Sequence, residues 1–269
     1  MAEASRESDR AQDQEVITAA MLVIGNEILS GRTQDANINY LAKTMTEIGV
    51  RLSEARVVPD QEAIVVEAVN DLRRRYAYLF TSGGIGPTHD DITVDCIAKA
   101  FGVAVVEHPE ARRILEDFYG EQLTEARLRM ARAPEGASLV INPVSGAPGL
   151  RIENVYIFAG VPRIFRGMVD GIAGELRTGA KLLSQTIVVQ SPESVLAGLL
   201  LETQSNHPDV EIGSYPFQRP GGFGVSVVLR SIDANRLSQC RTTLVAALRQ
   251  TGHVFEDSTP MKDDRQQKA

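Results

Sequence analysis

Apolar and polar positions alternate in regular blocks along the first two-thirds of the chain. A continuous apolar run at residues 18–24 ends at Gly25, which is typical of a buried strand that leads into a turn. Apolar residues then recur at helical spacing over residues 38–48, and they predict a helix with Asp35 as its N-cap and Gly49 as its stop.

Two further units of the same order follow. A strand ends at residues 57–58, and Asp60 can cap the helix after it; a third strand at residues 76–81 leads into a loop of small residues and a helix over residues 94–101. A strand at residues 155–159 and a helix at residues 163–176 complete the domain. This alternation predicts a three-layer α/β domain with a mostly parallel sheet, in which ligands bind beyond the carboxyl ends of the strands.

The pattern changes to shorter elements after residue 181. Their βαββα order predicts a small α+β subdomain over residues 184–256, beside an α/β domain over residues 15–180. Residues 1–14 and 257–269 are polar without apolar periodicity, so we expect disordered tails there. The predicted elements of the subdomain are a strand at 186–190, a helix capped by Ser191 with Pro192 at its first position, strands at 210–215 and 224–230, a helix at 235–248 and a last strand near Val254.

Composition and charge exclude several classes of function. A formal net charge of −7, from 28 Lys and Arg against 35 Asp and Glu, argues against a nucleic-acid surface. No apolar run approaches the length of about 18 residues that predicts a membrane span, and residues 1–14 lack a secretory signal. Two distant cysteines, Cys96 and Cys240, argue against a disulfide framework. We therefore expect a cytoplasmic protein that binds neither nucleic acid nor membrane.

The loop at residues 82–91, SGGIGPTHDD, holds the most informative candidate chemistry. Gly83, Gly84 and Gly86 permit positive φ and leave no side chains between backbone N–H groups and a ligand. The following helix adds its positive end, so a phosphate suits this loop. The alternative is a tight turn between strand and helix that binds nothing.

Three charged or titratable residues end this loop. Asp90 and Asp91 would repel a phosphate unless a divalent cation lay between them, and Mg²⁺ usually meets phosphates in this way. Alternatively, either carboxylate caps the following helix. His89 could donate a hydrogen bond or act as an acid, or it could be an exposed histidine without a function.

Four segments in order resemble one known family. TSGGIGPTHDDIT at residues 81–93 resembles the GG(L/T)GPTxDD(L/V)T signature of the MoaB/Mog family of molybdopterin-binding domains. Residues 24–50 resemble the opening of CinA proteins, PDQEAI at residues 59–64 matches the next turn, and NPVSGAPG with GVP completes the set. The resemblance covers residues 19–171 and indicates the domain found at the front of CinA proteins.

The resemblance also assigns residues to a pterin and phosphate pocket. It aligns Asp91 with the carboxylate most often credited with activity, and it places Glu27 at the family's acidic turn, where an exposed loop charge is the alternative. Asn142 and Pro143 could equally be plain turn formers. The other residues assigned to the site are Asp90 and Asp60, then Ser82, Gly83, Gly84, Gly86 and Thr88, and in a second ligand loop Ser145, Gly146 and Pro148.

Three functions are compatible with this resemblance. The first is a pyrophosphatase that uses Mg²⁺ or Co²⁺ on Asp90 and Asp91 and acts on a substrate such as ADP-ribose or FAD. The second is binding of molybdopterin or adenylyl transfer to it, and the third is a binding or regulatory module without catalysis. One scaffold hosts several functions, so the resemblance alone does not separate them.

The resemblance implies a small phosphorylated ligand and a homo-oligomer, either a dimer or a trimer. The small second unit favours the CinA side of the family. CinA proteins commonly continue into a deamidase domain, and that activity is not expected here because the sequence ends soon after the small unit.

Overall fold

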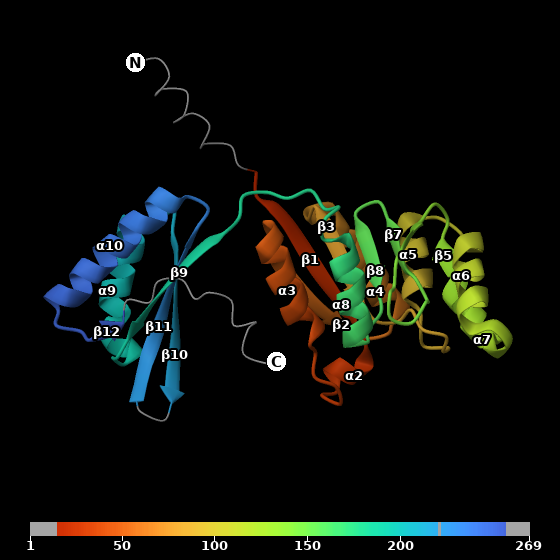
Figure 1. Cartoon of the computed structure of the whole chain (residues 1–269), viewed down its shortest axis with the longest axis horizontal. Coiled ribbons are helices and arrows are strands. Elements are labelled where there is room, and N and C mark those ends of the chain that lie inside the picture. The colour runs from red at the N-terminus through yellow and green to blue at the C-terminus, as the bar shows by residue number, and fades with distance from the viewer. Residues whose placement is uncertain (1–14, 220–221, 257–269) are drawn as a thin grey trace, which may run out of the picture. The chain divides into compact units, whose positions relative to one another are not determined.

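The computed structural model of the chain describes residues 15–219 and 222–256, which divide into two units (Figure 1). The first unit comprises Glu15–Ala180, and the second begins at Lys181. The tails that we expect to be disordered, residues 1–14 and 257–269, lie outside the described residues.

A six-stranded sheet with the order β2-β1-β3-β8-β7-β6 forms the centre of the first unit. The pairs β1–β2, β1–β3 and β3–β8 are parallel, whereas β7 runs antiparallel to both of its neighbours. The predicted mostly parallel sheet is therefore confirmed. The strands are β1 (Ile17–Ile24), β2 (Val50–Val58), β3 (Tyr78–Ser82), β6 (Ser138–Val140), β7 (Gly149–Ile152) and β8 (Val155–Phe158).

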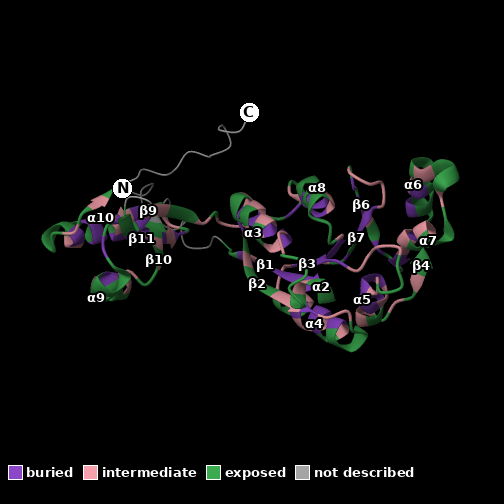
Figure 2. Ribbon diagram, turned by 90° about the horizontal axis from the view of Figure 1, so that it is seen from below, coloured by how far each residue is buried: buried purple, intermediate pink, exposed green. Residues whose placement is uncertain are grey.

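Alternating side chains of the central strands build two cores, one on each face of this sheet. Leu22 and Ile24 of β1 belong to the core under α4 (Glu62–Arg75) and α5 (Thr93–Phe101). Met21 and Val23 belong to the core under α3 (Asn37–Ile48) and α8 (Pro162–Ile172). Figure 2 shows the two pairs of helices on opposite sides of the buried strands. The three predicted layers follow from a strand whose residues 19–24 are all apolar and buried.

The ends of α3 lie close to their predicted places. Gly49 ends the helix in the left-handed conformation with φ 81°. The helix begins one residue later than expected, because Ala36 and not Asp35 occupies the N-cap position. The Asp35 carboxylate still accepts a hydrogen bond from the backbone N–H of Ile38 at 3.0 Å.

Two further predicted caps are wrong. Gln61 is the N-cap of α4 and makes no side-chain bond, while the Asp60 carboxylate accepts the backbone N–H of Asn26 at 2.8 Å. Asp60 bonds to Asn26 because the parallel strands β1 and β2 end side by side and bring these two residues together. In the second unit Pro192, and not Ser191, is the N-cap of α9 (Glu193–Asn206).

The structure adds elements between α5 and β6 that the sequence pattern does not predict. A short antiparallel pair and two helices enclose a small core of Ala111, Leu115 and Ala131. Tyr119 and Met130 pack against this core from the side. These elements are β4 (Val105–Glu107), α6 (Pro109–Tyr119), η2 (Gly120–Gln122), α7 (Glu125–Leu128), η3 (Arg129–Ala131) and β5 (Arg132–Pro134).

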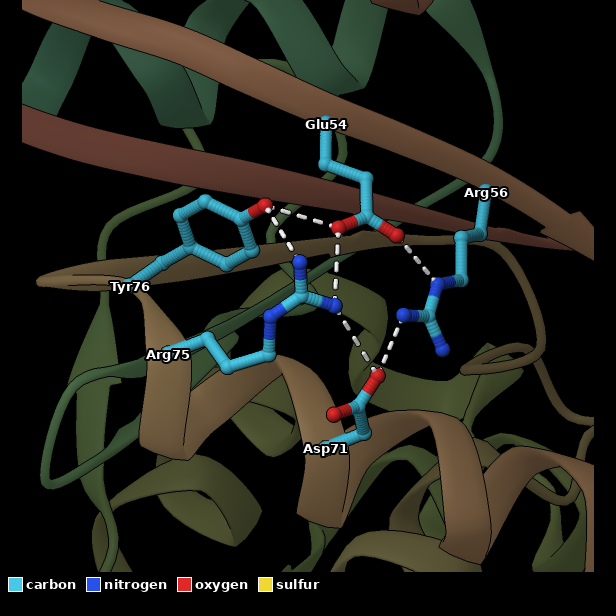
Figure 3. A network of polar contacts seen from close by, with 5 residues as sticks. All are labelled: Glu54, Arg56, Asp71, Arg75 and Tyr76. Carbon is cyan, nitrogen blue, oxygen red and sulfur yellow. Dashed lines mark hydrogen bonds and ion pairs between the residues drawn. The ribbon is translucent and has the colours of Figure 1, made fainter.

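A polar network ties the edge strand β2 to α4 (Figure 3). The Glu54 carboxylate accepts the Tyr76 hydroxyl at 2.7 Å and pairs with the guanidinium groups of Arg56 and Arg75. Both arginines also pair with Asp71 of α4. The arginines lower the pKa of Asp71, and the hydrogen bonds from Tyr76 and Arg56 lower the pKa of Glu54. Charges along an edge strand also discourage pairing with another strand.

The second unit is a four-stranded antiparallel sheet with the order β10-β11-β9-β12. Two helices, α9 and α10 (Ala234–Gln250), share one core with the sheet, so the predicted α+β architecture is confirmed. Within the part of the chain that the structure covers, no helix is both long and apolar enough to cross a membrane. The strands are β9 (Leu183–Val189), β10 (Glu211–Arg219), β11 (Gly222–Ser231) and β12 (Phe255–Glu256).

Each unit contains one buried cysteine, Cys96 in the first and Cys240 in the second, and burial raises the pKa of each thiol to about 11. At pH 8 roughly one thiol in a thousand is then ionised, and only the thiolate is nucleophilic. We expect neither cysteine to react with iodoacetamide in the native protein and both to react in denaturant. Because one thiol lies in each unit, mass spectrometry of partly denatured samples also measures the stability of each unit separately. Rapid labelling of the native protein at either position would show that its unit opens readily.

Candidate functional site

A cavity of about 500 Å³ lies at the carboxyl ends of β1, β3 and β8. Three segments that leave these strands line it: α2 (Asn26–Leu29), the loop at residues 83–91 and the start of α8. The chain passes from β1 to β2 on one side and then returns to β3 on the other. Such a reversal of strand order is where open α/β sheets bind their ligands.

Gly83 and Gly84 have positive φ, 105° and 66°, as the sequence predicts. The sequence predicts that a ligand approaches these glycines closely, but protein atoms fill the space beside their Cα atoms. A Cβ on Gly83 would lie 2.2 Å from the carbonyl oxygen of Ile24, and one on Gly84 would lie 2.3 Å from Oγ1 of Thr93. The glycines therefore allow the loop to pack against β1 and α5.

Thr93 at the start of α5 holds this loop in place. Its hydroxyl donates to the carbonyl of Gly83 at 2.9 Å, and its backbone N–H donates to the carbonyl of Gly84 at 3.0 Å. The N–H of Gly83 in turn donates to the carbonyl of Phe158 at the end of β8. The loop is thus fixed to two neighbouring elements before any ligand binds.

The structure separates Asp90 and Asp91. Asp91 lines the cavity, and its Oδ2 accepts the backbone N–H and the hydroxyl of Thr88 at 2.8 and 2.5 Å. The Asp90 side chain is 68% exposed and does not line the cavity, and the neighbouring Thr88 hydroxyl lowers its pKa. Neither carboxylate caps α5, since Ile92 is the N-cap and no side chain bonds there. Only Asp91 of the pair therefore lines the cavity.

Glu27 supplies the second carboxylate of the cavity wall. Its oxygens fold back over Gly25, where a Cβ would lie 2.6 Å from both of them. The bond from the Asn26 N–H to Asp60 fixes the same turn from the side of β2. Gly25 leaves room for this carboxylate, and Asp60 fixes the turn that carries Glu27.

The two carboxylates of the cavity suit a divalent cation whose remaining ligands come from water and from a bound phosphate. No group of three or more His, Cys, Asp or Glu side chains comes together in residues 15–219 and 222–256. Mg²⁺ is commonly held by one or two carboxylates together with water and substrate phosphates. Glu27 and Asp91, which both line the cavity, fit that mode of binding and do not fit a preformed protein cage.

Three lining residues come from the segment without predicted elements: Tyr119, Arg127 and Met130. The Arg127 guanidinium lies 4.3 Å from the centroid of the Tyr119 ring and donates to the carbonyl of Gln122. A guanidinium at this wall can offset phosphate charge. No local motif marks these residues, because they reach the cavity through the packing of α6, α7 and η3.

The second ligand loop, residues 142–148, is organised by Asn142. Its amide donates to the Ser145 hydroxyl and the Ala147 carbonyl, both at 2.7 Å, and its Oδ1 accepts the Val144 N–H. Asn142 and Ser145 line the cavity, as does Pro148. Asn142 therefore holds the turn of this loop together and also lines the cavity.

Other predicted site residues lie outside this cavity. Gly146 packs beneath Phe118, whose ring would lie 2.5 Å from an added Cβ, and Pro143 is exposed. Ser82 is buried, and its hydroxyl accepts from Asn37. The His89 side chain is 95% exposed, with Nδ1 4.0 Å from Asp90. Thr88 and Asp60 instead contact Asp91 and Asn26, as described above.

Residues 20–178 match the model of a family described as "Probable molybdopterin binding domain". The chain belongs to this family. Residues 181–257 match a second family, described as "FAD synthase, middle domain". The two matches together support a small pterin or nucleotide as the ligand of this family member.

Several proteins of known sequence or structure are similar to this chain. A protein of Aeropyrum pernix is 32% identical over 89% of this chain and 94% of its own length. A protein of Pyrobaculum calidifontis is 34% identical over 74% of this chain and 80% of its own. The crystal structure of CinA from Thermoplasma acidophilum, a protein of unknown function, has 31% identity and a TM-score of 0.56, covering 60% of this chain and 98% of that one. The resemblance to the CinA front domain is thus confirmed.

The packing of the glycine loop predicts how substitutions there act. We expect Gly84→Ala to lower the free energy of unfolding by roughly 2–4 kcal/mol, through positive φ and the clash with Thr93. Gly102→Ala is the matched control, since Gly102 has φ 69° and nothing within 4 Å of an added Cβ. It should lose only about 1 kcal/mol. Equal losses in urea denaturation would contradict the packing role.

Proposed function

We propose that this cavity binds a phosphorylated nucleotide and hydrolyses its diphosphate linkage with a divalent cation, Mg²⁺ or Co²⁺. One observation carries the proposal: two carboxylates, Glu27 and Asp91, line a glycine-bordered cavity at the carboxyl edge of the sheet. Carboxylates beside phosphates repel them unless a cation lies between, so an acidic wall in a phosphate site favours a metal-dependent reaction.

Each part of the cavity has a role in this proposal. Glu27 and Asp91 hold the cation, which when bound supplies Lewis-acid polarisation of a phosphate oxygen. Arg127 offsets phosphate charge at the cavity wall, and backbone groups of the loop at residues 83–87 border the phosphates. The Thr88 bonds keep the Asp91 carboxylate in one orientation.

FAD and ADP-ribose are the substrate class that we favour. The similarity of residues 181–257 to the FAD synthase middle domain supports FAD as the first compound to test. The description of the first family favours an alternative, in which the cavity binds molybdopterin or transfers an adenylyl group to it. A module that binds its ligand without catalysis is the third candidate. We also propose a homo-oligomer, dimer or trimer, in the cytoplasm.

Product identification separates these functions. The purified chain is incubated with FAD, with ADP-ribose, or with molybdopterin and ATP, each with Mg²⁺, Co²⁺ or EDTA, and the products are identified by mass spectrometry. We expect FAD to give FMN and AMP, and ADP-ribose to give AMP and ribose 5-phosphate, only with the cation. Adenylylated molybdopterin would favour the alternative, and binding without any product would favour the inert module.

Asp91→Asn tests the cation-holding role. The asparagine oxygen can still accept the Thr88 N–H, so the loop should keep its shape while the negative charge is lost. We expect kcat/KM to fall by roughly 100-fold, about 2.7 kcal/mol of transition-state stabilisation.

Asp90→Asn is the matched control for this substitution. It removes the same charge one residue away, on a side chain that does not line the cavity, and should change kcat/KM by less than about threefold. Losses of similar size in the two variants would argue against Asp91 as a ligand of the cation.

A further inference from the structure

A second, smaller pocket of about 50 Å³ adjoins the cavity, and we name it the side pocket. Glu27, Gly83 and Gly160 line both spaces, and Asp35, Asn37 and Ser82 line only the side pocket. Gly83 and Gly160 are in contact here, because a Cβ on Gly160 would lie 3.2 Å from the Cα of Gly83. The side pocket is therefore next to the loop that borders the proposed phosphate position.

Asn37, the first residue of α3, is 4% exposed and is braced by two hydrogen bonds. Its Nδ2 donates to the hydroxyl of Ser82 at 2.9 Å and to the carbonyl of Gly160 at 2.8 Å. A carbonyl oxygen can only accept, so this contact fixes which end of the amide carries the N–H groups. Both N–H groups are used, and Oδ1 must be the acceptor.

The Oδ1 atom of Asn37 is buried and has no hydrogen-bond partner among the residues that the structure covers. A buried acceptor without a partner costs about 1–3 kcal/mol, so such a group calls for a physical explanation. The bonds to Ser82 and Gly160 prevent the amide from turning to find a partner elsewhere. Asn37 lines the side pocket, so a hydrogen-bond donor that enters this pocket can supply the missing partner.

Carboxylates and a carbonyl form part of the side pocket, together with the side chains of Thr33, Gln34 and Ser82, which carry both donors and acceptors. The Glu27 and Asp35 side chains are carboxylates, and the carbonyl of Gly160 already accepts from Asn37. A donor group pairs with these acceptors, whereas an apolar group would leave the Asn37 acceptor without a partner. A space of about 50 Å³ holds a hydroxyl, since a water molecule takes about 30 Å³ of liquid, but it does not hold an aromatic ring.

We infer that Asn37 is a specificity-determining residue, which accepts a hydrogen bond from a ribose hydroxyl of the bound nucleotide. This rests on the proposed function, because it takes the phosphates to lie beside Gly83. A ribose hydroxyl is the donor that a nucleotide carries nearest to its phosphates, whereas the amino groups of the base lie farther away. The site would thus distinguish ribonucleotides from deoxynucleotides through a buried acceptor that loses its partner.

Calorimetric titration of the full chain with ADP, 2′-deoxy-ADP and 3′-deoxy-ADP, in Mg²⁺, tests this without any substitution. We expect one of the two deoxy compounds to bind at least about tenfold more weakly than ADP, as one lost buried hydrogen bond implies. The deoxy compound that is affected identifies the hydroxyl.

Asn37→Ala should remove the discrimination, so that ADP and the affected deoxy compound bind within about twofold of each other. Asn154→Ala is the matched control, because the Asn154 amide likewise donates to two carbonyls, of Arg73 and Tyr76, in the turn before β8. It should lose comparable stability and keep the wild-type preference for ADP.

The outcomes separate this inference from the function on which it rests. Equal binding of all three compounds by the wild-type chain would overturn the role of Asn37, which a water molecule would then satisfy, and leave nucleotide binding intact. Preference for ADP that persists in Asn37→Ala would likewise overturn it. Failure of the wild-type chain to bind ADP at all would overturn both.

Discussion

Parallel pairing of β1 with β2 and β3 is the constraint on which the site depends. The register joins Ile24 to Val58 and Val23 to Ser82, so the chain leaves three neighbouring strands at one edge. Both faces of β1 are buried, and a slip of one residue would exchange the side chains of the two cores. The same register that buries the apolar side chains therefore also brings Glu27 and the glycine loop to one cavity.

Polar side chains then hold the loops of the site in place. Thr93 holds the glycine loop, Asn142 holds the second ligand loop, and Asp60 holds the turn that carries Glu27. Each makes bonds to backbone groups, which would otherwise be left without partners at the ends of strands and helices. Asn37 follows the same pattern with its N–H groups but leaves one acceptor without a partner, and we base the proposal that it meets a ligand on this acceptor.

Local sequence patterns predict the features of this molecule that depend only on neighbouring residues. The apolar run of β1, the stop at Gly49 and the positive φ of Gly83 could all be predicted from neighbouring residues. The hydrogen bond from the Asn26 N–H to Asp60 and the placement of Arg127 could not, because each depends on elements that meet only after folding. The adjacent aspartates Asp90 and Asp91 look alike in the sequence, and only the turn at Thr88 distinguishes them.

Hydrogen exchange of the backbone amides, with and without FAD and Mg²⁺, tests most directly whether this edge of the sheet is the ligand site. The account predicts that the ligand slows exchange in four separate segments that line the cavity: residues 26–29, 83–91, 142–148 and 159–164. Exchange at the opposite edge of the sheet, around Asn154, should not change. Protection confined to residues 183–256, or protection that leaves the glycine loop unchanged, would contradict it.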